Sequence, residues 1–395
     1  MFGENRFSFK NEYLANFVNK NILSMKKIAF VSTNDTTRWA GSEELWSQTA
    51  ISMANQDFTI GVNVKGWKLA SNKIQELEQA NCCVVRRWYD KNIIDKLTLK
   101  VFKHELFFKW LNKFKPDLVV ISQGINYEDK GWMDACLRRN IPYAVIIHAA
   151  AEQFWPSDEL AAKASKVYQS AERCFFVSQR NLELTVKQLA TALDNAKIVR
   201  NPYNVSYNVA PSWPKDEGVL KLACVGRLDP DSKGQDILFE VLGLEKWKSR
   251  PIEVTLFGNG YQQNTLKALR DLWSLDNVKF GGFVDNVEAI WANHHALVLP
   301  SRFEGLPLAV VEAMLCGRFC IVTDVAGNTE LIEDNINGFV AKAPKAEYLD
   351  DAMERAWQRR ESWYELGKEA YVSVRKVIPS DPIDKFLNEI KLLLE

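Results

Sequence analysis

The sequence of 395 residues contains no apolar run of about 18 residues, the length that a membrane-spanning helix requires. Its first residues lack the long apolar core of a secretory signal peptide. None of the seven cysteines forms a pair of Cys-x-x-Cys units, so a structural zinc site is not expected. We therefore predict a reduced, cytoplasmic protein.

Two common catalytic motifs are also missing. There is no Gly-x-Ser-x-Gly nucleophile elbow and no Gly-Lys-Ser/Thr phosphate loop, which removes the main support for a hydrolase or a P-loop NTPase. Asp229-Pro-Asp231 resembles a metal-binding Asp-x-Asp motif, but so short a motif is common by chance, and Pro230 suits a turn. We expect no bound metal. We also expect no nucleic-acid partner, because the positive charge is modest and no recognition motif is present.

The composition is that of a soluble globular protein, with 47% hydrophobic and 25% charged residues, and the length favours two domains. The net charge of zero hides an asymmetry along the chain. Residues 1–210 hold 28 Lys and Arg against 21 Asp and Glu, whereas the remainder holds 22 against 29. Two halves of opposite sign suggest two domains with different partners.

Strand-like and helix-like segments alternate along the whole chain, a pattern typical of parallel sheets covered by helices. Proline-containing breaks at 201–202 and 211–214 indicate a linker between two doubly wound, Rossmann-like domains, whose shared cleft is the expected ligand site. We expect an N-terminal extension (1–24), two domains (25–205 and 206–378) and a C-terminal helix (379–395) that packs back towards the first domain. The expected strands are near 27–32, 58–64, 82–86, 117–122, 142–147, 173–177, 197–199, 221–225, 252–257, 278–280, 295–299, 319–323 and 338–341.

The most informative segment runs from Ser301 to Met314 and places seven residues between Glu304 and Glu312. A predicted strand leads into a loop with Glu304, and Pro307 stands where the first helical residue is expected. The start of that helix would present backbone N–H groups and a positive dipole to an anion, beside two carboxylates suited to hydroxyl groups. A ligand with both phosphate and hydroxyl groups, such as a nucleotide sugar, fits this arrangement.

A second segment contains Gly226 at the end of a buried strand, followed by Arg227 and Lys233. Two cations at the carboxyl end of a strand suit a diphosphate, since they bind it and neutralise its charge as it leaves. Taken alone, the same residues would more simply be surface cations in a polar loop. The nearby acidic segment favours the diphosphate interpretation.

Weaker signals come from four other strand ends. Gly258 lies in a segment that weakly resembles a glycine-rich phosphate loop, although an ordinary strand-to-helix turn explains it equally well. The backbone of Phe283 and Val284, after the next strand, could contact the edge of a nucleotide base. His148 ends an apolar strand and should face the cleft. The alternative is a structural histidine at the rim of the sheet, with its hydrogen bonds made within the protein. Gly41 opens the first helix and would leave N–H groups free for a phosphate.

These ordered motifs resemble the family 4 glycosyltransferases, which have the two-domain GT-B fold. The resemblance extends from about Lys26 and is tightest between Leu222 and Ala341, where 323–332 and Asn337-Gly338 supply a third motif. It implies a retaining enzyme without metal or cofactor that moves a hexose-type sugar from a nucleotide diphosphate, with UDP favoured over GDP. The acceptor would be a hydroxyl of a glycan or lipid-linked molecule, as in polysaccharide biosynthesis. The first domain would bind the acceptor and the second the donor. In the front-face mechanism usual for this family, the leaving phosphate helps to take the acceptor proton.

The resemblance also implies roles for single residues. Arg227 and Lys233 would hold the diphosphate, Glu304 and His148 would contact the sugar, and Glu312 would hold the ribose. The implied catalytic residues are Glu304, His148, Arg227 and Lys233, and the implied donor-binding residues are Gly41, Gly226, Arg227, Lys233, Gly258, Phe283, Val284, Glu304, Gly305, Leu306, Pro307, Leu308 and Glu312. The chain departs from the family pattern at Ser42, where many members have a second glycine, and at 203–205.

Residues 90–117 combine seven lysines with five aromatic side chains, which suits a helix lying on an anionic membrane surface. A core-facing apolar stripe with a solvated lysine face explains the same pattern equally well. The extension 1–24 is expected to be a packed helix, with a peripheral membrane anchor as the alternative. Two other functions remain open, a non-catalytic scaffold that binds nucleotide sugars and another GT-B enzyme such as a nucleotide-sugar epimerase.

Overall fold

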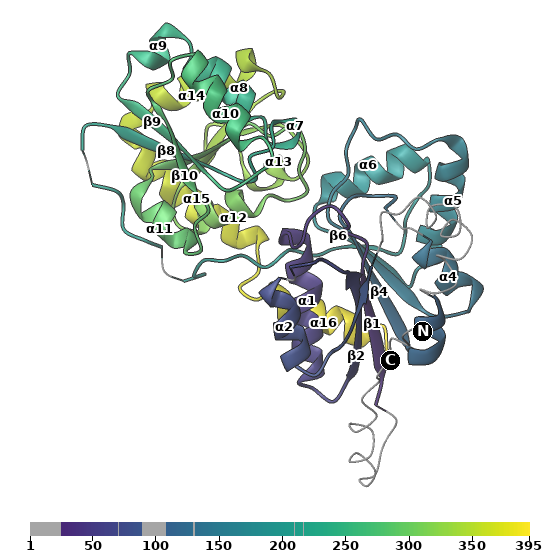
Figure 1. Ribbon diagram of the computed structural model, residues 1–395. Coiled ribbons are helices and arrows are strands. Elements are labelled where there is room, and N and C mark those ends of the chain that lie inside the picture. The colour runs from purple at the N-terminus through teal and green to yellow at the C-terminus, as the bar shows by residue number, and fades with distance from the viewer. Residues whose placement is uncertain (1–24, 70, 89–107, 129–130, 209, 216) are drawn as a thin grey trace, which may run out of the picture.

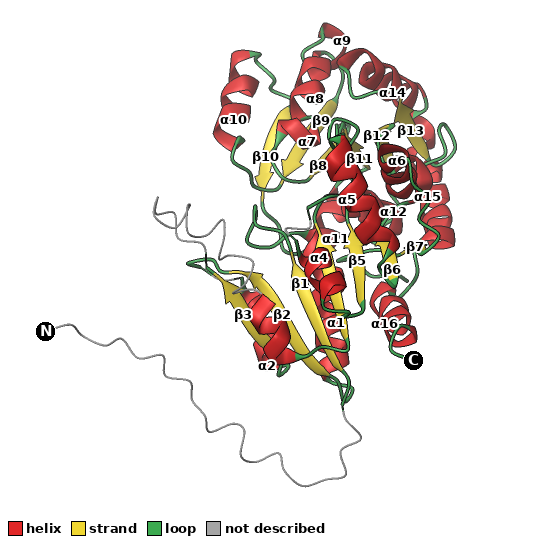
Figure 2. Ribbon diagram, turned by 90° about the vertical axis from the view of Figure 1, so that its right-hand side faces the viewer, coloured by secondary structure: helices red, strands yellow, loops and turns green. Residues whose placement is uncertain are grey.

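The computed structural model describes residues 25–395 except 70, 89–107, 129–130, 209 and 216 (Figure 1). It contains a seven-stranded sheet of order β3-β2-β1-β4-β5-β6-β7 and a six-stranded sheet of order β10-β9-β8-β11-β12-β13. Neighbouring strands are parallel throughout both sheets. Helices cover the sheets, so the predicted class of two doubly wound α/β domains is confirmed (Figure 2).

The first domain buries both faces of its sheet. Along β1, Ile28 and Phe30 belong to one apolar cluster, and Ala29 and Val31 to another, because successive side chains of a strand point to opposite faces. Its strands are β1 (Lys27–Ser32), β2 (Thr59–Lys65), β3 (Cys83–Arg87), β4 (Leu118–Gln123), β5 (Tyr143–Ile147), β6 (Arg173–Phe176) and β7 (Ala196–Ile198). Its helices are α1 (Gly41–Ala54), α2 (Asn72–Gln79), α4 (Trp132–Arg138), α5 (Asp158–Gln169) and α6 (Gln179–Leu189).

The second domain is built around one apolar core. Its strands are β8 (Leu220–Val225), β9 (Ile252–Phe257), β10 (Val278–Gly282), β11 (Ala296–Leu299), β12 (Phe319–Thr323) and β13 (Gly338–Ala341). Its helices are α7 (Pro230–Lys233), α8 (Gln235–Leu242), α9 (Glu245–Lys248), α10 (Gln263–Leu272), α11 (Val287–Asn293), α12 (Leu308–Leu315), α13 (Asn328–Leu331), α14 (Ala346–Gln358) and α15 (Trp363–Val377), with a short 3₁₀ turn η1 (Arg360–Ser362). The thirteen strands expected from the sequence are all present within two residues of the predicted ends.

The last helix, α16 (Pro382–Leu392), crosses back to the first domain and lies beside α1 (Figure 1). It begins sharply because the Asp381 carboxylate accepts a hydrogen bond of 2.8 Å from the N–H of Asp384, and Pro382 follows the cap. Phe386 is buried in the first domain, with its ring 5.0 Å from that of Phe175. The first domain therefore owes part of its core to the end of the chain.

The segment predicted to reach a membrane, 90–117, falls mostly outside the described residues, as does 1–24. In its described part, Phe108 and Leu111 are buried in the core of the first domain, and Trp110 stacks on Phe114 with ring centroids 5.6 Å apart. The apolar side chains of this part face the sheet, as the core-facing alternative predicts. None of the helices in the described ranges combines the length and apolar character that a bilayer crossing needs.

Candidate active site

A cleft of about 1930 Å³ lies between the two domains, at the carboxyl ends of the strands of both sheets. The loops after β1, β4 and β5 line it from the first domain. The loops after β8 and β11, together with the start of α12, line it from the second domain. This is the position at which open α/β sheets bind their ligands.

Twelve of the predicted site residues line this cleft, namely Gly41, His148, Gly226, Arg227, Lys233, Phe283, Glu304, Gly305, Leu306, Pro307, Leu308 and Glu312. Within the described ranges, Gly258 and Val284 do not. Gly258 lies directly under the backbone of Gly226, where an added Cβ would be 2.0 Å from the Gly226 carbonyl oxygen, so it serves close strand-to-strand packing. Val284 packs against the hydrophobic core.

Glu304 is held in a fixed position at the bottom of the cleft. Its Oε1 accepts hydrogen bonds of 2.6 Å from Lys233 Nζ and 2.7 Å from Ser301 Oγ, and the residue is only 6% exposed. The ion pair joins the two segments that were singled out separately in the sequence. A carboxylate fixed in this way has acceptor capacity left for a hydroxyl group of a ligand.

Glu312 lies in the second turn of α12 and is almost fully buried. Its Oε1 accepts hydrogen bonds from the backbone N–H of Asn204 at 2.9 Å and from Asn204 Nδ2 at 3.0 Å. Burial raises the pKa of Glu312 to about 7, and the two bonds from Asn204 oppose this by a smaller amount. The carboxyl group is therefore poised between its neutral and charged forms near neutral pH.

His148 follows β5 and is buried at the wall of the cleft. Its Nε2 lies 3.2 Å from Ser122 Oγ, whereas Nδ1 is buried without a hydrogen-bond partner in the described part of the chain. Burial lowers the pKa of His148 to about 3, and the neighbouring Asn201 raises it by less. The ring is neutral at physiological pH, so it can exchange a hydrogen bond with a ligand but cannot offer a positive charge.

The two predicted phosphate-binding cations differ in exposure. The Lys233 side chain is 18% exposed and paired with Glu304, whereas that of Arg227 is 55% exposed at the mouth of the cleft, 3.7 Å from Asp229. Asp229 in turn accepts a hydrogen bond of 2.7 Å from Ser232 Oγ, which gives it a role within the loop. Among the described residues, no three His, Cys, Asp or Glu side chains gather where they could share a metal ion.

Two helices begin at the cleft without a side-chain cap. The cap positions are Ala40 for α1 and Pro307 for α12, and neither side chain accepts a hydrogen bond from its helix. The sequence predicted Pro307 as the first helical residue. In the structure its backbone is extended, so Pro307 is the cap that precedes the helix. The two helix starts approach each other, since a Cβ on Gly41 would lie 3.1 Å from Leu308 Cδ1. Their first N–H groups have no partner within the helices and favour an anion between them.

The same loop forms the contact between the domains. A Cβ on Gly305 would lie only 1.9 Å from the carbonyl oxygen of His148, so glycine is needed for the first domain to approach. The carbonyl of Gly305 also accepts a hydrogen bond of 2.9 Å from the N–H of Gly327. A 3.1 Å ion pair between Arg200 and Glu330 adds a second contact across the interface.

Sequence reasoning missed several residues that line the cleft, of which Asn204 is the most closely tied to a predicted site residue. The break at Asn201-Pro202 marked this segment only as a linker. Nothing in the local sequence indicates that Asn204 bonds to Glu312, which is 108 positions away. Asn34 and Trp39 also line the cleft, from the loop that leads to Gly41.

Comparison with known proteins found a family match for the second domain and solved structures with a similar fold. Residues 220–359 match the family model of group 1 glycosyl transferases. The chain is 29% identical to the alpha-D-kanosaminyltransferase of Streptomyces kanamyceticus over 33% of this chain and 34% of that protein. It is 32% identical to an Escherichia coli UDP-Gal:alpha-D-GlcNAc-diphosphoundecaprenol alpha-1,3-galactosyltransferase over 19% of each chain. The alignments with the first curated relatives span only about a third of those proteins.

A solved structure resembles the whole molecule. The crystal structure of Anabaena HepE in complex with UDP-glucose superposes with a TM-score of 0.71 at 18% identity, covering 93% of this chain and 99% of that one. The chain thus has the GT-B fold of such glycosyltransferases, and its residues 220–359 match the group 1 glycosyl transferases.

Proposed function

We propose that the protein is a retaining glycosyltransferase that moves a hexose-type sugar from UDP to a hydroxyl of a glycan or lipid-linked acceptor, without a metal ion. One observation carries this proposal. The Glu304–Lys233 pair, the buried Glu312 and two uncapped helix starts converge on one cleft between two doubly wound domains. That combination offers cations and N–H groups for a diphosphate, and carboxylates for hydroxyl groups.

In the proposed reaction the diphosphate lies against Arg227, Lys233 and the start of α12. Glu312 accepts hydrogen bonds from the ribose hydroxyls, and Glu304 from a hydroxyl of the transferred sugar. The bond between sugar C1 and the β-phosphate oxygen breaks while the acceptor oxygen bonds to C1 from the same face, which retains the configuration. The acceptor proton passes to the departing β-phosphate. The products are UDP and the glycoside, and the two cations neutralise the charge that grows on the phosphate.

The choice of UDP is supported by similar proteins whose bound or named nucleotide is UDP. HepE was crystallised with UDP and with UDP-glucose, and the galactosyltransferase of Escherichia coli carries UDP-Gal in its name. That enzyme's name also specifies an acceptor linked to diphosphoundecaprenol, in keeping with a lipid-linked acceptor here. The absence of a metal, the cytoplasmic location and any attachment of 90–117 to an anionic membrane remain predictions.

Calorimetric titration with UDP, GDP, ADP and dTDP in the presence of EDTA tests the donor site. We expect selective binding of UDP, and loss of about tenfold or more in affinity for Arg227→Gln, since a charge-assisted hydrogen bond contributes about 1.5–3 kcal/mol. The control is Lys279→Gln, which removes an exposed cation from β10 that does not line the cleft. Equal binding of all four nucleotides, or none, would count against the proposal.

Transfer itself is tested by UDP release from UDP-glucose and UDP-galactose with a panel of acceptor glycosides. Glu304→Gln should lose most turnover and keep its fold, whereas Glu347→Gln, an exposed carboxylate in the first turn of α14, should match the wild type. Binding of UDP-sugar without turnover on any acceptor would favour the non-catalytic scaffold. Inversion of a stereocentre of the nucleotide sugar, without transfer to an acceptor, would favour an epimerase.

A further inference from the structure

A second space between the two domains adjoins the main cleft. Phe303 and Glu304 line both, so the loop that holds Glu304 forms their common wall. From the first domain the second space is lined by the loop after β5 and by α6, and from the second domain by the loops after β11, β12 and β13. Water can reach about 690 Å³ of this interdomain pocket, a volume within the range of about 300–1,000 Å³ that is usual for ligand sites.

Most charged side chains in the interdomain pocket already have partners of opposite sign. The guanidinium of Arg302 donates to the two oxygens of Asp236 at 2.6 and 2.7 Å, and that of Arg180 is paired with Asp324. The other charged side chains that line the pocket are Glu152, Asp231, Lys342 and Glu304, the last of which is paired with Lys233. Cations do not outnumber carboxylates among the lining residues, so the pocket does not select for an anion.

The Arg180–Asp324 pair spans the two domains and presents a donor beside an acceptor. Arg180 lies in the first turn of α6, and Asp324 follows β12. Within the described part of the chain, the hydrogen bonds of the Arg180 side chain use only Nη1, and those of the Asp324 carboxylate use only Oδ1. Both side chains are more than a third exposed. A sugar hydroxyl can accept from this guanidinium and donate to this carboxylate at once, because a hydroxyl is both donor and acceptor.

Two aromatic rings stand where the pocket meets the cleft. The ring of Phe303 lines both spaces, and that of Phe154 meets it edge to face, with centroids 6.5 Å apart. Phe154 is 52% exposed, yet its loop is anchored, because Gln188 Nε2 donates to the carbonyls of Ala151 at 2.8 Å and of Phe154 at 3.4 Å. Exposed apolar rings at the rim of a polar pocket mark a binding surface, and the C–H face of a sugar ring can pack on them.

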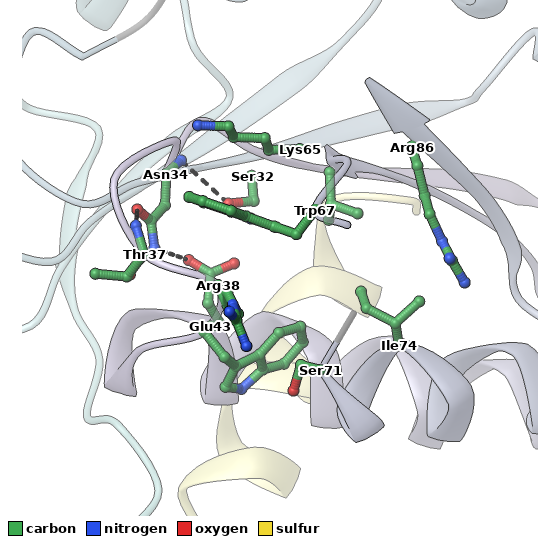
Figure 3. Close-up of a pocket in the computed structure, with 12 residues that line it drawn as sticks. Ser32, Asn34, Thr37, Arg38, Glu43, Lys65, Trp67, Ser71, Ile74 and Arg86 are labelled. Atoms are coloured by element: carbon green, nitrogen blue, oxygen red, sulfur yellow. Dashed lines mark hydrogen bonds between the residues drawn. The ribbon is translucent and has the colours of Figure 1, made fainter. Parts of the chain in front are cut away.

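A smaller pocket lies at another wall of the cleft, and Figure 3 shows Trp67 and Glu43 on its two sides. Asn34, Thr37 and Trp39 line both this pocket and the cleft. Water can reach only about 20 Å³ of it, which is room for about one water molecule. It cannot hold a sugar ring, whereas the interdomain pocket can.

We propose that the interdomain pocket is an acceptor subsite for a neutral glycan, and that it holds the sugar unit next to the one that is glycosylated. The glycosylated unit lies in the main cleft beside Glu304. Its neighbour lies beyond Phe303, with hydroxyl groups bonded to the Arg180–Asp324 pair. This inference rests on the proposed glycosyltransferase function, to which it adds that the acceptor has at least two sugar units.

The lining favours a glycan over two other classes of ligand. An alkyl chain would cover the phenylalanine rings, but it would take Arg180 and Asp324 out of water without replacing the hydrogen bonds they lose. An anion would be drawn to the cations, but it would meet at least as many carboxylates. A sugar ring offers a C–H face to the aromatic rings and hydroxyl groups to the charged pair, so it uses both features.

The test compares four acceptors on the full-length protein, with the UDP-sugar that supports turnover: methyl glucoside, methyl maltoside, methyl cellobioside and octyl glucoside. Methyl glycosides are chosen because the methyl group is too small to occupy the subsite itself. We expect kcat/KM to be about tenfold or more higher for at least one disaccharide than for methyl glucoside, since the second unit adds contacts that the methyl group cannot make.

Leu184→Trp is the decisive variant, because Leu184 lines the interdomain pocket but not the cleft, and the larger side chain would fill part of the pocket. It should keep UDP affinity and transfer to methyl glucoside, and lose most of the preference for the disaccharide. Phe154→Ala should lose part of that preference. The matched controls, Leu244→Trp and Tyr364→Ala, change residues of similar exposure outside both spaces and should behave as the wild type.

Equal kcat/KM for methyl glucoside and both disaccharides, or an undiminished preference in Leu184→Trp, would overturn the inference. A higher kcat/KM for octyl glucoside than for either disaccharide would also overturn it, since a lipid chain would then be the better occupant. UDP titration in parallel separates this failure from that of the underlying function. Wild-type protein that binds UDP but gains nothing from a second sugar unit, or transfers to none of the four acceptors, refutes the neutral-glycan subsite. Wild-type protein that binds no UDP refutes the proposed function as well.

Discussion

The substitution Glu312→Gln is predicted to stabilise the protein at alkaline pH while it weakens UDP binding. In the free protein the carboxylate is buried under Asn204, and burial raises its pKa from the ordinary 4.5 to about 7. Between these two values the folded protein keeps a proton that the unfolded chain has lost. The contribution of Glu312 to stability is therefore complete below pH 4.5 and is lost as the pH rises through 7.

The magnitude follows from the same two pKa values. At about 1.4 kcal/mol per pKa unit, the ionised Glu312 costs the folded protein about 3 kcal/mol at pH 8, an upper value because the site can relax. Glutamine carries no charge, and its side-chain oxygen can still accept the bonds from Asn204. The melting temperature of Glu312→Gln should match that of the wild type near pH 5 and exceed it by several degrees at pH 8.

The assay is a series of thermal melts from pH 5 to pH 8.5 on the wild type, Glu312→Gln and the exposed-site control Glu347→Gln, each with and without UDP. In the wild type the ionised carboxylate is the better ribose acceptor, so UDP binding should tighten as the pH rises through 7. The variant should lack that gain, and comparing the two proteins cancels the titration of UDP itself. A stability difference that stays constant with pH would refute this reasoning.

Three further predictions concern the loop, the last helix and the ion pair. Gly305→Ala should lower kcat/KM at least about tenfold, because the new Cβ of the alanine would clash with the His148 carbonyl. Small-angle X-ray scattering should then show two intact domains that lie further apart. Phe386→Ala should destabilise the first domain by about 3–5 kcal/mol in calorimetry, whereas the exposed Lys385→Ala should not. Lys233→Met should weaken UDP binding about tenfold or more, and an unchanged affinity would remove Lys233 from the proposed diphosphate site.

The fold was accessible from the sequence because it depends on local patterns. The buried strand 319–323 is a mainly apolar run, and the ends of both 252–257 and 319–323 were predicted to the residue. The convergence of Glu304, Lys233 and Gly41 also followed from topology. The carboxyl ends of parallel strands meet at one edge of each sheet, and the two edges were expected to face a shared cleft. These arguments need only the order of elements along the chain.

The remaining features of the site depend on contacts between distant residues. Asn204 reaches Glu312 across 108 positions, and Gly258 serves the backbone of a neighbouring strand although its sequence resembles a phosphate loop. The neutral state of His148 likewise results from its burial at the wall of the cleft, which the sequence could not distinguish from a place at the open rim. Such properties are set by packing and by the solvent that packing excludes, so no local motif carries them.

In the proposed reaction, the loop from Ser301 to Pro307 would join donor recognition to the position of the first domain. At its centre, Glu304 is fixed by Lys233 and Ser301, and the next residue, Gly305, lies against the carbonyl of His148. A ligand that draws Lys233 towards a diphosphate must change the ion pair of Glu304, and therefore the loop on which the first domain rests. Because coupling requires that both events alter one physical element, this loop is where donor binding and domain closure would be linked. The linkage predicts that UDP narrows the domain separation in the wild type and fails to do so in Gly305→Ala, even where that variant still binds UDP.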